Sequence, residues 1–275
     1  MRRTLRIRVS RVVIGFAIVL GPLLPVPARA AVMCGGHAAT ITGTGGDDTI
    51  AGTSGPDVIV AFGGNDLISG GGGNDIICAG LGNNIVGGGD GEDHIYGSND
   101  RDILSGGNGN DFLSGGGGED ILTGERGNDV LNGGPANDVL LGGLGTDTIS
   151  FVGASAKVSA SLVLGKATGG AGVDIIQSAE NLTGSRFADN LVGNALRNTI
   201  RGLGGNDRLV GLGQNDRLIG GRGNDVELGG TGKDVLIGNQ GSDRLVGGPG
   251  VDHADGGSGK DTCIQDDFNT KNCEK

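Results

Sequence analysis

Aspartate recurs at every ninth residue along most of this chain, and that spacing defines the chemistry available to it. The repeating unit is G-G-x-G-x-D-x-U-x, where U is a large aliphatic residue, and residues 106–114 (GGNGNDFLS) are a clean copy. Twenty-one units occur, twelve in residues 43–150 and nine in residues 184–264. Carboxylates beside glycine-rich turns, which can aim backbone carbonyls inward, are the oxygen ligands that calcium prefers.

The sixth position of the unit holds the candidate metal ligands. Nineteen are Asp48, Asp57, Asp66, Asp75, Asp93, Asp102, Asp111, Asp120, Asp129, Asp138, Asp147, Asp189, Asp207, Asp216, Asp225, Asp234, Asp243, Asp252 and Asp261. The other two, Asn84 and Asn198, are weaker candidates because an amide carries no charge.

The rest of the unit predicts what positions these side chains. The last three residues suit a short strand whose central, eighth residue points into a core. That position is aliphatic in eighteen units, the exceptions being Glu227, Ala254 and Cys263. With 62 Gly and no Trp, the chain cannot build an ordinary globular core. A fixed period of nine instead indicates a solenoid.

The repeat resembles the haemolysin-type, or repeats-in-toxin (RTX), calcium-binding family. The resemblance implies an all-β fold, a right-handed parallel β-roll or β-helix with eighteen residues per coil and an ion between successive turns on one side. The implied ligands are Asp pairs eighteen residues apart and carbonyls of the second and fourth positions. A pair that includes Asn84 or Asn198 lacks one carboxylate and is not counted. The pairs in which both residues are Asp predict roughly fourteen Ca²⁺ sites.

The N-terminal residues predict export. Residues 1–30 combine five arginines, an apolar run and the cleavage motif Ala28-Arg29-Ala30, so they are interpreted as a signal peptide that is removed before Ala31. An uncleaved anchor is the alternative. We expect a secreted, extracellular protein with no transmembrane segment in the mature chain. Residues 31–42 and 265–275 are expected to cap the solenoid.

Residues 151–183 interrupt the repeats and are interpreted as an irregular β connector. Residues 157–164 alternate polar and apolar side chains, which predicts a strand, and residues 173–182 predict another extended piece. Residues 165–172 predict a turn-rich link. We expect one continuous solenoid; a hinge between two solenoids is the competing interpretation.

Four cysteines follow the signal peptide, an even number that suits an oxidising compartment. Three pairings are possible. The most local ones, Cys34 with Cys78 and Cys263 with Cys273, are favoured because each would staple one end of the solenoid. Free buried thiols are the alternative.

Charge is distributed unevenly. Removing residues 1–30 takes away six arginines, so the formal charge falls from −11 to −17, which disfavours nucleic acid and attracts cations. Block one (43–150) has a net charge of −15 and block two (184–264) of −1. Full calcium loading would leave block two cationic, so either its sites are only partly filled or the loaded form has a cationic end that suits an anionic cell-surface or matrix polymer as partner. The alternative is solvated arginines that moderate self-repulsion.

The seventh position of block one is unusually apolar and is expected to face outward. Its members are Val58, Leu67, Ile76, Ile85, Ile103, Phe112, Ile121, Val130 and Val139. Either β-propensity accounts for them, or they form an adhesive stripe for self-association or for a partner.

These features favour a secreted protein that folds on binding multiple calcium ions and acts as a non-catalytic structural or surface-interaction module. No H-E-x-x-H motif is present and the three histidines are scattered. An extracellular matrix or adhesion protein that uses an apolar or cationic face is the main alternative, and an accessory part of an exported hydrolase is a weaker one. Ice binding would need an array of threonines at the third position of the repeat, and Thr231 is the only threonine found there.

Overall fold

The repeats fold into short strands separated by tight turns in the computed structural model, which describes residues 31–264 and 269–274. The regular elements within these residues are all strands. No helix in this part of the chain is long and apolar enough to cross a membrane. The proposed signal peptide lies outside the described residues.

Most strands belong to two sheets. The first sheet has fourteen strands, in the order β28 (Thr262–Ile264), β26 (Arg244–Val246), β24 (Val226–Thr231), β22 (Arg208–Gly213), β20 (Asn190–Val192), β16 (Val158–Ser161), β17 (Lys166–Gly169), β18 (Gly172–Gln177), β14 (Val139–Leu144), β12 (Ile121–Arg126), β10 (Ile103–Asn108), β8 (Ile85–Asp90), β6 (Leu67–Gly72) and β4 (Thr49–Ala51).

The second sheet has thirteen strands, in the order β29 (Asn269–Lys271), β27 (His253–Ser258), β25 (Val235–Gln240), β23 (Arg217–Arg222), β21 (Thr199–Gly204), β19 (Asn181–Thr183), β15 (Thr148–Ser150), β13 (Val130–Asn132), β11 (Phe112–Gly116), β9 (His94–Ser98), β7 (Ile76–Cys78), β5 (Val58–Val60) and β3 (Ile41–Thr42). A separate antiparallel pair, β1 (Met33–Cys34) and β2 (His37–Ala38), precedes them.

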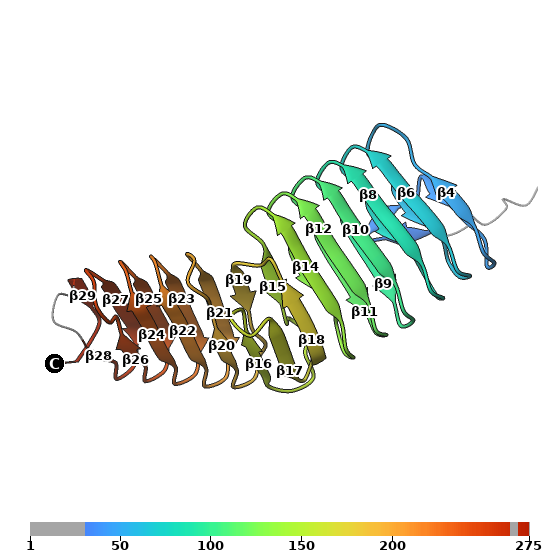
Figure 1. Cartoon of the computed structure of the whole chain (residues 1–275). Helices are drawn as coiled ribbons and strands as arrows, with labels where there is room; N and C mark the ends of the chain where they lie inside the picture. Colours follow the sequence, from blue (N-terminus) through green and yellow to red (C-terminus); the bar gives the residue numbers. More distant parts are fainter. Residues whose placement is uncertain (1–30, 265–268, 275) are drawn as a thin grey trace, which may run out of the picture. The chain divides into compact units, whose positions relative to one another are not determined.

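Successive units alternate between the two sheets, and within each sheet neighbouring repeat strands run parallel (Figure 1). Ile103 pairs with Ile121 and Phe112 pairs with Val130, so one coil contains eighteen residues. The expected parallel β-solenoid is therefore confirmed. Each coil places one turn on either side of the roll, and turns eighteen residues apart lie next to each other.

Most of the core consists of eighth-position side chains, which form one row along each sheet. Leu104, Leu113, Leu122 and Leu131 are fully buried, and nearly all of their counterparts are buried too. Strand alternation sends the seventh and ninth residues outward, as expected. Side chains from the two sheets fill the narrow space between them, and glycine turns close its sides.

The outer seventh position forms rows along the first sheet. Leu67, Ile85 and Ile103 are exposed and lie in register on β6, β8 and β10. Further along block one the seventh-position side chains are half-buried. The row exists as expected, and its use for self-association stays a prediction.

Both sheets continue through residues 151–183. In the second sheet β15 pairs with β19, and in the first sheet the antiparallel strands β16, β17 and β18 lie between β14 and β20. The expected turn-rich link at 165–172 is only partly present, because β17 occupies half of it and turns flank that strand on both sides. Its side chains alternate, with Ala167 buried between the more exposed Lys166 and Thr168. This alternation covers only a few residues and is flanked by glycines, so it did not indicate a strand.

Two disulfides join the ends of the roll to neighbouring coils. Cys34 on β1 bonds to Cys78 on β7, and Cys263 on β28 bonds to Cys273, each with a Cα–Cα distance of 5.8 Å. This is the pairing that the sequence favoured. Both bonds close the exposed ends, where a stacked repeat has only one neighbour.

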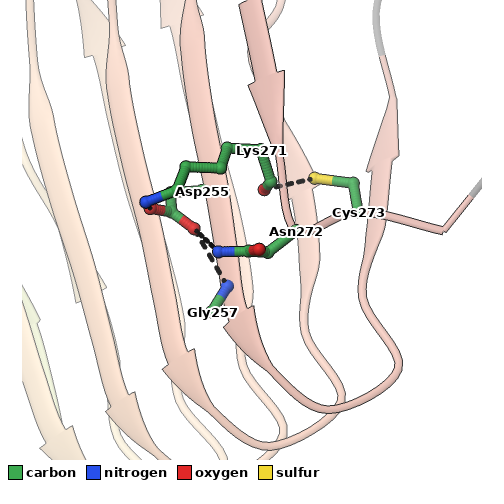
Figure 2. A network of polar contacts seen from close by, with 5 residues as sticks. All are labelled: Asp255, Gly257, Lys271, Asn272 and Cys273. Carbon is green, nitrogen blue, oxygen red and sulfur yellow. Dashed lines mark hydrogen bonds and ion pairs between the residues drawn. The ribbon is translucent and has the colours of Figure 1, made fainter.

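A polar network also fixes the last coil (Figure 2). The side-chain amide of Asn272 donates to Asp255 at 2.8 Å, the backbone N–H of Gly257 donates to the same oxygen at 3.2 Å, and the Lys271 ammonium lies 3.4 Å from the other oxygen. The Asn272 hydrogen bond, followed by the Lys271 contacts, holds the pKa of Asp255 below its ordinary value. Lys271 and Asp255 form the one ion pair found among the described residues.

Candidate metal centres

A repeated hydrogen bond joins the sixth-position residues along each side of the roll. The backbone N–H of Asp93 donates to Oδ1 of Asp111 at 2.8 Å, and the N–H of Asp111 donates to Oδ1 of Asp129 at 2.8 Å. The structure therefore brings together the residues that the sequence paired at eighteen. All the sixth-position side chains are buried except Asp48, which is half-buried.

The second carboxylate oxygen of most sixth-position aspartates is buried and has no hydrogen-bond partner. This applies to Oδ2 of Asp66, Asp75, Asp93, Asp111, Asp120, Asp129, Asp138, Asp147, Asp207, Asp216, Asp225, Asp234, Asp243, Asp252 and Asp261. A buried carboxylate oxygen without a partner is costly, and native structures pair such atoms with donors or with cations.

Further oxygens surround these unpartnered atoms. The space that a Cβ on Gly115 would fill is bordered by Oδ2 of Asp120 from the same turn and by the carbonyl oxygen of Gly133 from the next coil, the latter at 2.7 Å. The same arrangement recurs at Gly88, where Oδ2 of Asp93 and the Gly106 carbonyl border the space. Nineteen of the twenty-one units have glycine at this first position, and the other two have the small residues Ala61 and Ala79, because little space is left beside the oxygens.

Asn84 shows which carbonyls face the sixth side chain. Its amide nitrogen, in the place of an aspartate oxygen, donates to the carbonyls of Gly80 and Gly82 at 3.0 Å each. These are the second and fourth residues of its own turn, the carbonyls that the family resemblance implied. Where the sixth residue is Asp, the same kind of turn presents a third oxygen instead of a donor. An all-oxygen pocket of this kind fits calcium.

The sites rely on carbonyls as much as on carboxylates. Among residues 31–264 and 269–274 there is no group of three or more His, Cys, Asp or Glu side chains able to hold a metal together. Each turn except those of Asn84 and Asn198 contains one sixth-position Asp, and backbone carbonyls are the other oxygens near it. Calcium, when bound, would supply the positive charge that these oxygens face.

Burial raises the pKa of most of the carboxyls that have an unpartnered oxygen. Desolvation is the largest cause, and neighbouring aspartates add to it: the pKa of Asp111, Asp120, Asp207 and Asp216 rises to about 7. The N–H donated by the preceding coil opposes the shift without cancelling it. A metal-free roll therefore favours protonated turns, whereas a divalent ion would favour ionised ones.

Five turns are built differently. Their second residue is Thr44, Thr53, Ser98, Ser185 or Asn194, and its backbone N–H donates to the sixth side chain of the same turn. In the turn that holds Asp57, the Thr53 N–H donates to Oδ2 at 2.7 Å and the Thr53 hydroxyl donates to it at 2.9 Å. These bonds, the Thr53 backbone bond first, hold the pKa of Asp57 below its ordinary value.

Two connector residues that the sequence reasoning missed take the sixth-position role. The N–H of Asp138 donates to Oδ1 of Asp174 at 3.1 Å, and the N–H of Asp147 donates to Glu180 at 2.9 Å. Asp174 is buried, and desolvation raises its pKa to about 7. It lies thirty-six residues after Asp138 in the sequence, which is twice the eighteen-residue coil length. That spacing was the signal that could have identified it. Glu180 lies off the eighteen-residue spacing.

Together, the stacked coils and oxygen-lined turns define a repeat protein whose turns suit hard cations. The chain matches the model of the RTX calcium-binding nonapeptide repeat, described as four copies, over residues 42–77, 79–113, 114–149, 192–227 and 228–263. These segments cover more than half of the chain, so it belongs to the RTX calcium-binding repeat family. The comparison with curated proteins gave no match.

Proposed function

We propose that this chain is a secreted, non-catalytic module that folds on binding calcium in its glycine–aspartate turns and then serves as a rigid structural or surface-interaction element. The observation that carries the proposal is the set of fifteen buried Asp oxygens without a hydrogen-bond partner. We assign the ions to turns that combine such an oxygen with the carbonyls of positions two and four.

The energetics favour coupled folding and binding. Leaving a buried polar group unpaired costs about 1–3 kcal/mol, and more when it is charged. Fifteen such groups exceed the roughly 5–15 kcal/mol by which a typical domain is stable. The thin core, one aliphatic residue per nine, cannot offset that cost. At neutral pH the ionised roll therefore needs its cations.

The test compares the secreted chain in millimolar calcium and after chelation. We expect a β-rich circular dichroism spectrum and a compact sedimenting species in calcium, and loss of both in EDTA. Restoring calcium should refold the chain, whereas magnesium, which dehydrates reluctantly and demands octahedral geometry, should be far less effective. An unchanged β spectrum and equal heat resistance after exhaustive chelation would contradict the proposal.

Export is part of the proposal. A signal peptide at 1–30, an N-terminal cap at 31–42, the connector at 151–183 and a C-terminal cap at 265–275 complete the organisation, and residues 265–268 and 275 lie outside the described residues. Both disulfides support an oxidising destination. Mass spectrometry of the exported protein should show Ala31 as its first residue.

We also propose an anionic cell-surface or matrix polymer as partner of block two. Its arginines at the outer seventh position, Arg208, Arg217 and Arg244, are exposed. Among the described residues none of them forms an ion pair. Because calcium would neutralise the buried aspartates and leave these outer charges unchanged, loading would make the surface of block two cationic.

A further inference from the structure

We propose that the second residue of a turn can close that turn to calcium, and that it does so in five of the twenty-one turns. This inference rests on the proposed calcium binding and adds its selectivity. The residues that close a turn are Thr44, Thr53, Ser98, Ser185 and Asn194.

Backbone conformation at the second position separates the two kinds of turn without exception. In sixteen turns the second residue has a positive φ, as at Gly107 (114°) and Leu203 (77°). Fifteen of these turns contain the unpartnered Asp oxygens, and the sixteenth contains Asn84, which fills the pocket with its own amide. The five remaining second residues have no positive φ, and all of them donate their N–H to the sixth side chain.

The chemical reason is a reversal of polarity. We call the sixteen turns with a positive φ at the second residue open and the other five closed. In an open turn the carbonyl of the second residue faces the sixth side chain, as the hydrogen bond from Asn84 to Gly80 shows. Where the sixth residue is Asp, a carbonyl oxygen therefore faces a carboxylate oxygen. In a closed turn the second residue turns its N–H there instead, and a hydroxyl can add a second donor, as Ser185 does to Asp189 at 2.9 Å. Donor hydrogens carry positive partial charge and satisfy the carboxylate. A cation then finds neither free oxygens nor a favourable field.

Left-handed backbone does not require glycine here. Phe62, Glu125, Leu203, Leu212 and Asn239 occupy the second position with φ between 75° and 87°. The turns of these residues keep an unpartnered Asp oxygen. Closure therefore follows from a short side chain able to hydrogen-bond locally, Ser, Thr or Asn in the right-handed or extended region, and not from the mere loss of glycine.

The closed turns have a regular location. Those of Asp48 and Asp57 form the first coil of block one, on both sides of the roll, and those of Asp189 and Asn198 form the first coil of block two. Only the turn of Asp102 lies inside a block. Each block thus begins with a coil that needs no ion. Because solenoid coils are stabilised by their neighbours, these coils can template the calcium-dependent ones.

The experiment measures calcium stoichiometry on the full secreted chain by native mass spectrometry, checked by equilibrium dialysis with atomic emission. Wild type should bind roughly fifteen ions, one for each unpartnered oxygen. Thr53→Gly frees the second position for the left-handed region and should add one ion. Gly107→Ser should remove one ion, as should Asp111→Ala in the same turn. Ser114→Gly, outside the turn, is the matched control and should leave the count unchanged.

The outcomes separate the two proposals. A wild-type chain that binds no calcium overturns the proposed function itself. A wild-type chain that binds calcium, together with unchanged counts in both Thr53→Gly and Gly107→Ser, overturns the role of the second residue. Misfolding cannot imitate the gain expected of Thr53→Gly. If Gly107→Ser fails to fold, the second gain variant, Ser185→Gly, decides: an added ion supports the proposal and an unchanged count refutes it.

Discussion

Block one and block two share the same turns but have different surfaces. Block one contains eight unpartnered Asp oxygens and block two contains seven, in turns of the same geometry. In total, and including the sixth-position aspartates, block one has 17 acids and 2 bases, whereas block two has 10 acids and 9 bases. With one divalent ion per unpartnered oxygen, the formal charges would become about +1 and about +13.

This difference shows that the residues that form the turn are separate from the residues that set the charge of the surface. The first, sixth and eighth residues build the turn and the core, and in both blocks they are nearly always a small residue, Asp and an aliphatic residue, respectively. The third, fifth, seventh and ninth residues point outward and can carry any charge that a strand or turn tolerates. Block one uses this freedom for apolar and acidic side chains, and block two uses it for arginine.

The largest expected effect is one that both blocks should share, because it acts on the buried turns. In EDTA, lowering the pH from about 7.5 to about 4 should restore β structure throughout the roll. Folded-state pKa values of Asp111 and Asp207 near 7, above the ordinary 3.8, mean that the folded chain binds protons more tightly than the unfolded chain. Protonation thus favours folding, and the advantage is lost as the pH rises from about 3.8 to about 7.

Hydrogen exchange with mass spectrometry of the intact chain can follow peptides of each block during this titration. Protection should appear in both blocks over the same pH range. In saturating calcium the trend should reverse, because protons compete with the ion for the carboxylates. Protection of one block alone on acidification would show that the blocks do not share their turn chemistry.

The next effect should distinguish the blocks. Calcium-loaded protein should bind dextran sulfate, used as a model polyanion, and not neutral dextran. The triple variant Arg208→Gln, Arg217→Gln, Arg244→Gln should bind about tenfold more weakly or worse, and wild-type binding should weaken with added salt. Measurement is by biolayer interferometry at fixed free calcium.

The matched control is the block-one double variant Arg101→Gln, Arg126→Gln, which should bind like wild type. Equal losses in the two variants would mean that net charge alone attracts the polymer. Binding that ignores both salt and the arginines would refute a cationic surface on block two.

The smallest effect concerns Glu227, the one acidic side chain in the eighth-position ladder. It pairs with Leu209 and Leu245 on neighbouring strands and is fully buried, and one oxygen accepts the Gly220 N–H at 2.7 Å while the other has no partner. Burial raises its pKa well above the ordinary value. Replacing Glu227 by Leu should stabilise the roll by about 1–3 kcal/mol.

Thermal unfolding at fixed free calcium measures that gain. Glu227→Gln is the control, because it keeps the side-chain volume and an acceptor for Gly220 while removing the charge, and its gain should be smaller than that of Leu. A loss of stability in the Leu variant would mean that block two needs Glu227 in its core. The cores of the two blocks would then not be equivalent.

The sequence predicted the turns more completely than the connector. Asp111 and its counterparts were identified because a period of nine is visible without any structure, and Leu104 or Leu113 followed from strand alternation. Lys166 and Thr168 were not recognised as part of a strand, because the antiparallel strands β16 to β18 depend on pairings between segments of unequal length. Asp174 was missed for the same reason: its partner Asp138 is defined by the stacking of coils.

The repeating residues by themselves determined the coil length, the inward ladder and the chemistry of an oxygen-lined turn, because each of these depends on local spacing. Tertiary structure alone decided which Asp oxygens are left without a partner, since that depends on the N–H donated from the adjacent coil and on the peptide orientation at the second position. Ser98 and Gly107 look like minor variation in a glycine-rich repeat. In the fold Ser98 donates its N–H to Oδ2 of Asp102, whereas Gly107 has a positive φ and Oδ2 of Asp111 is left without a partner.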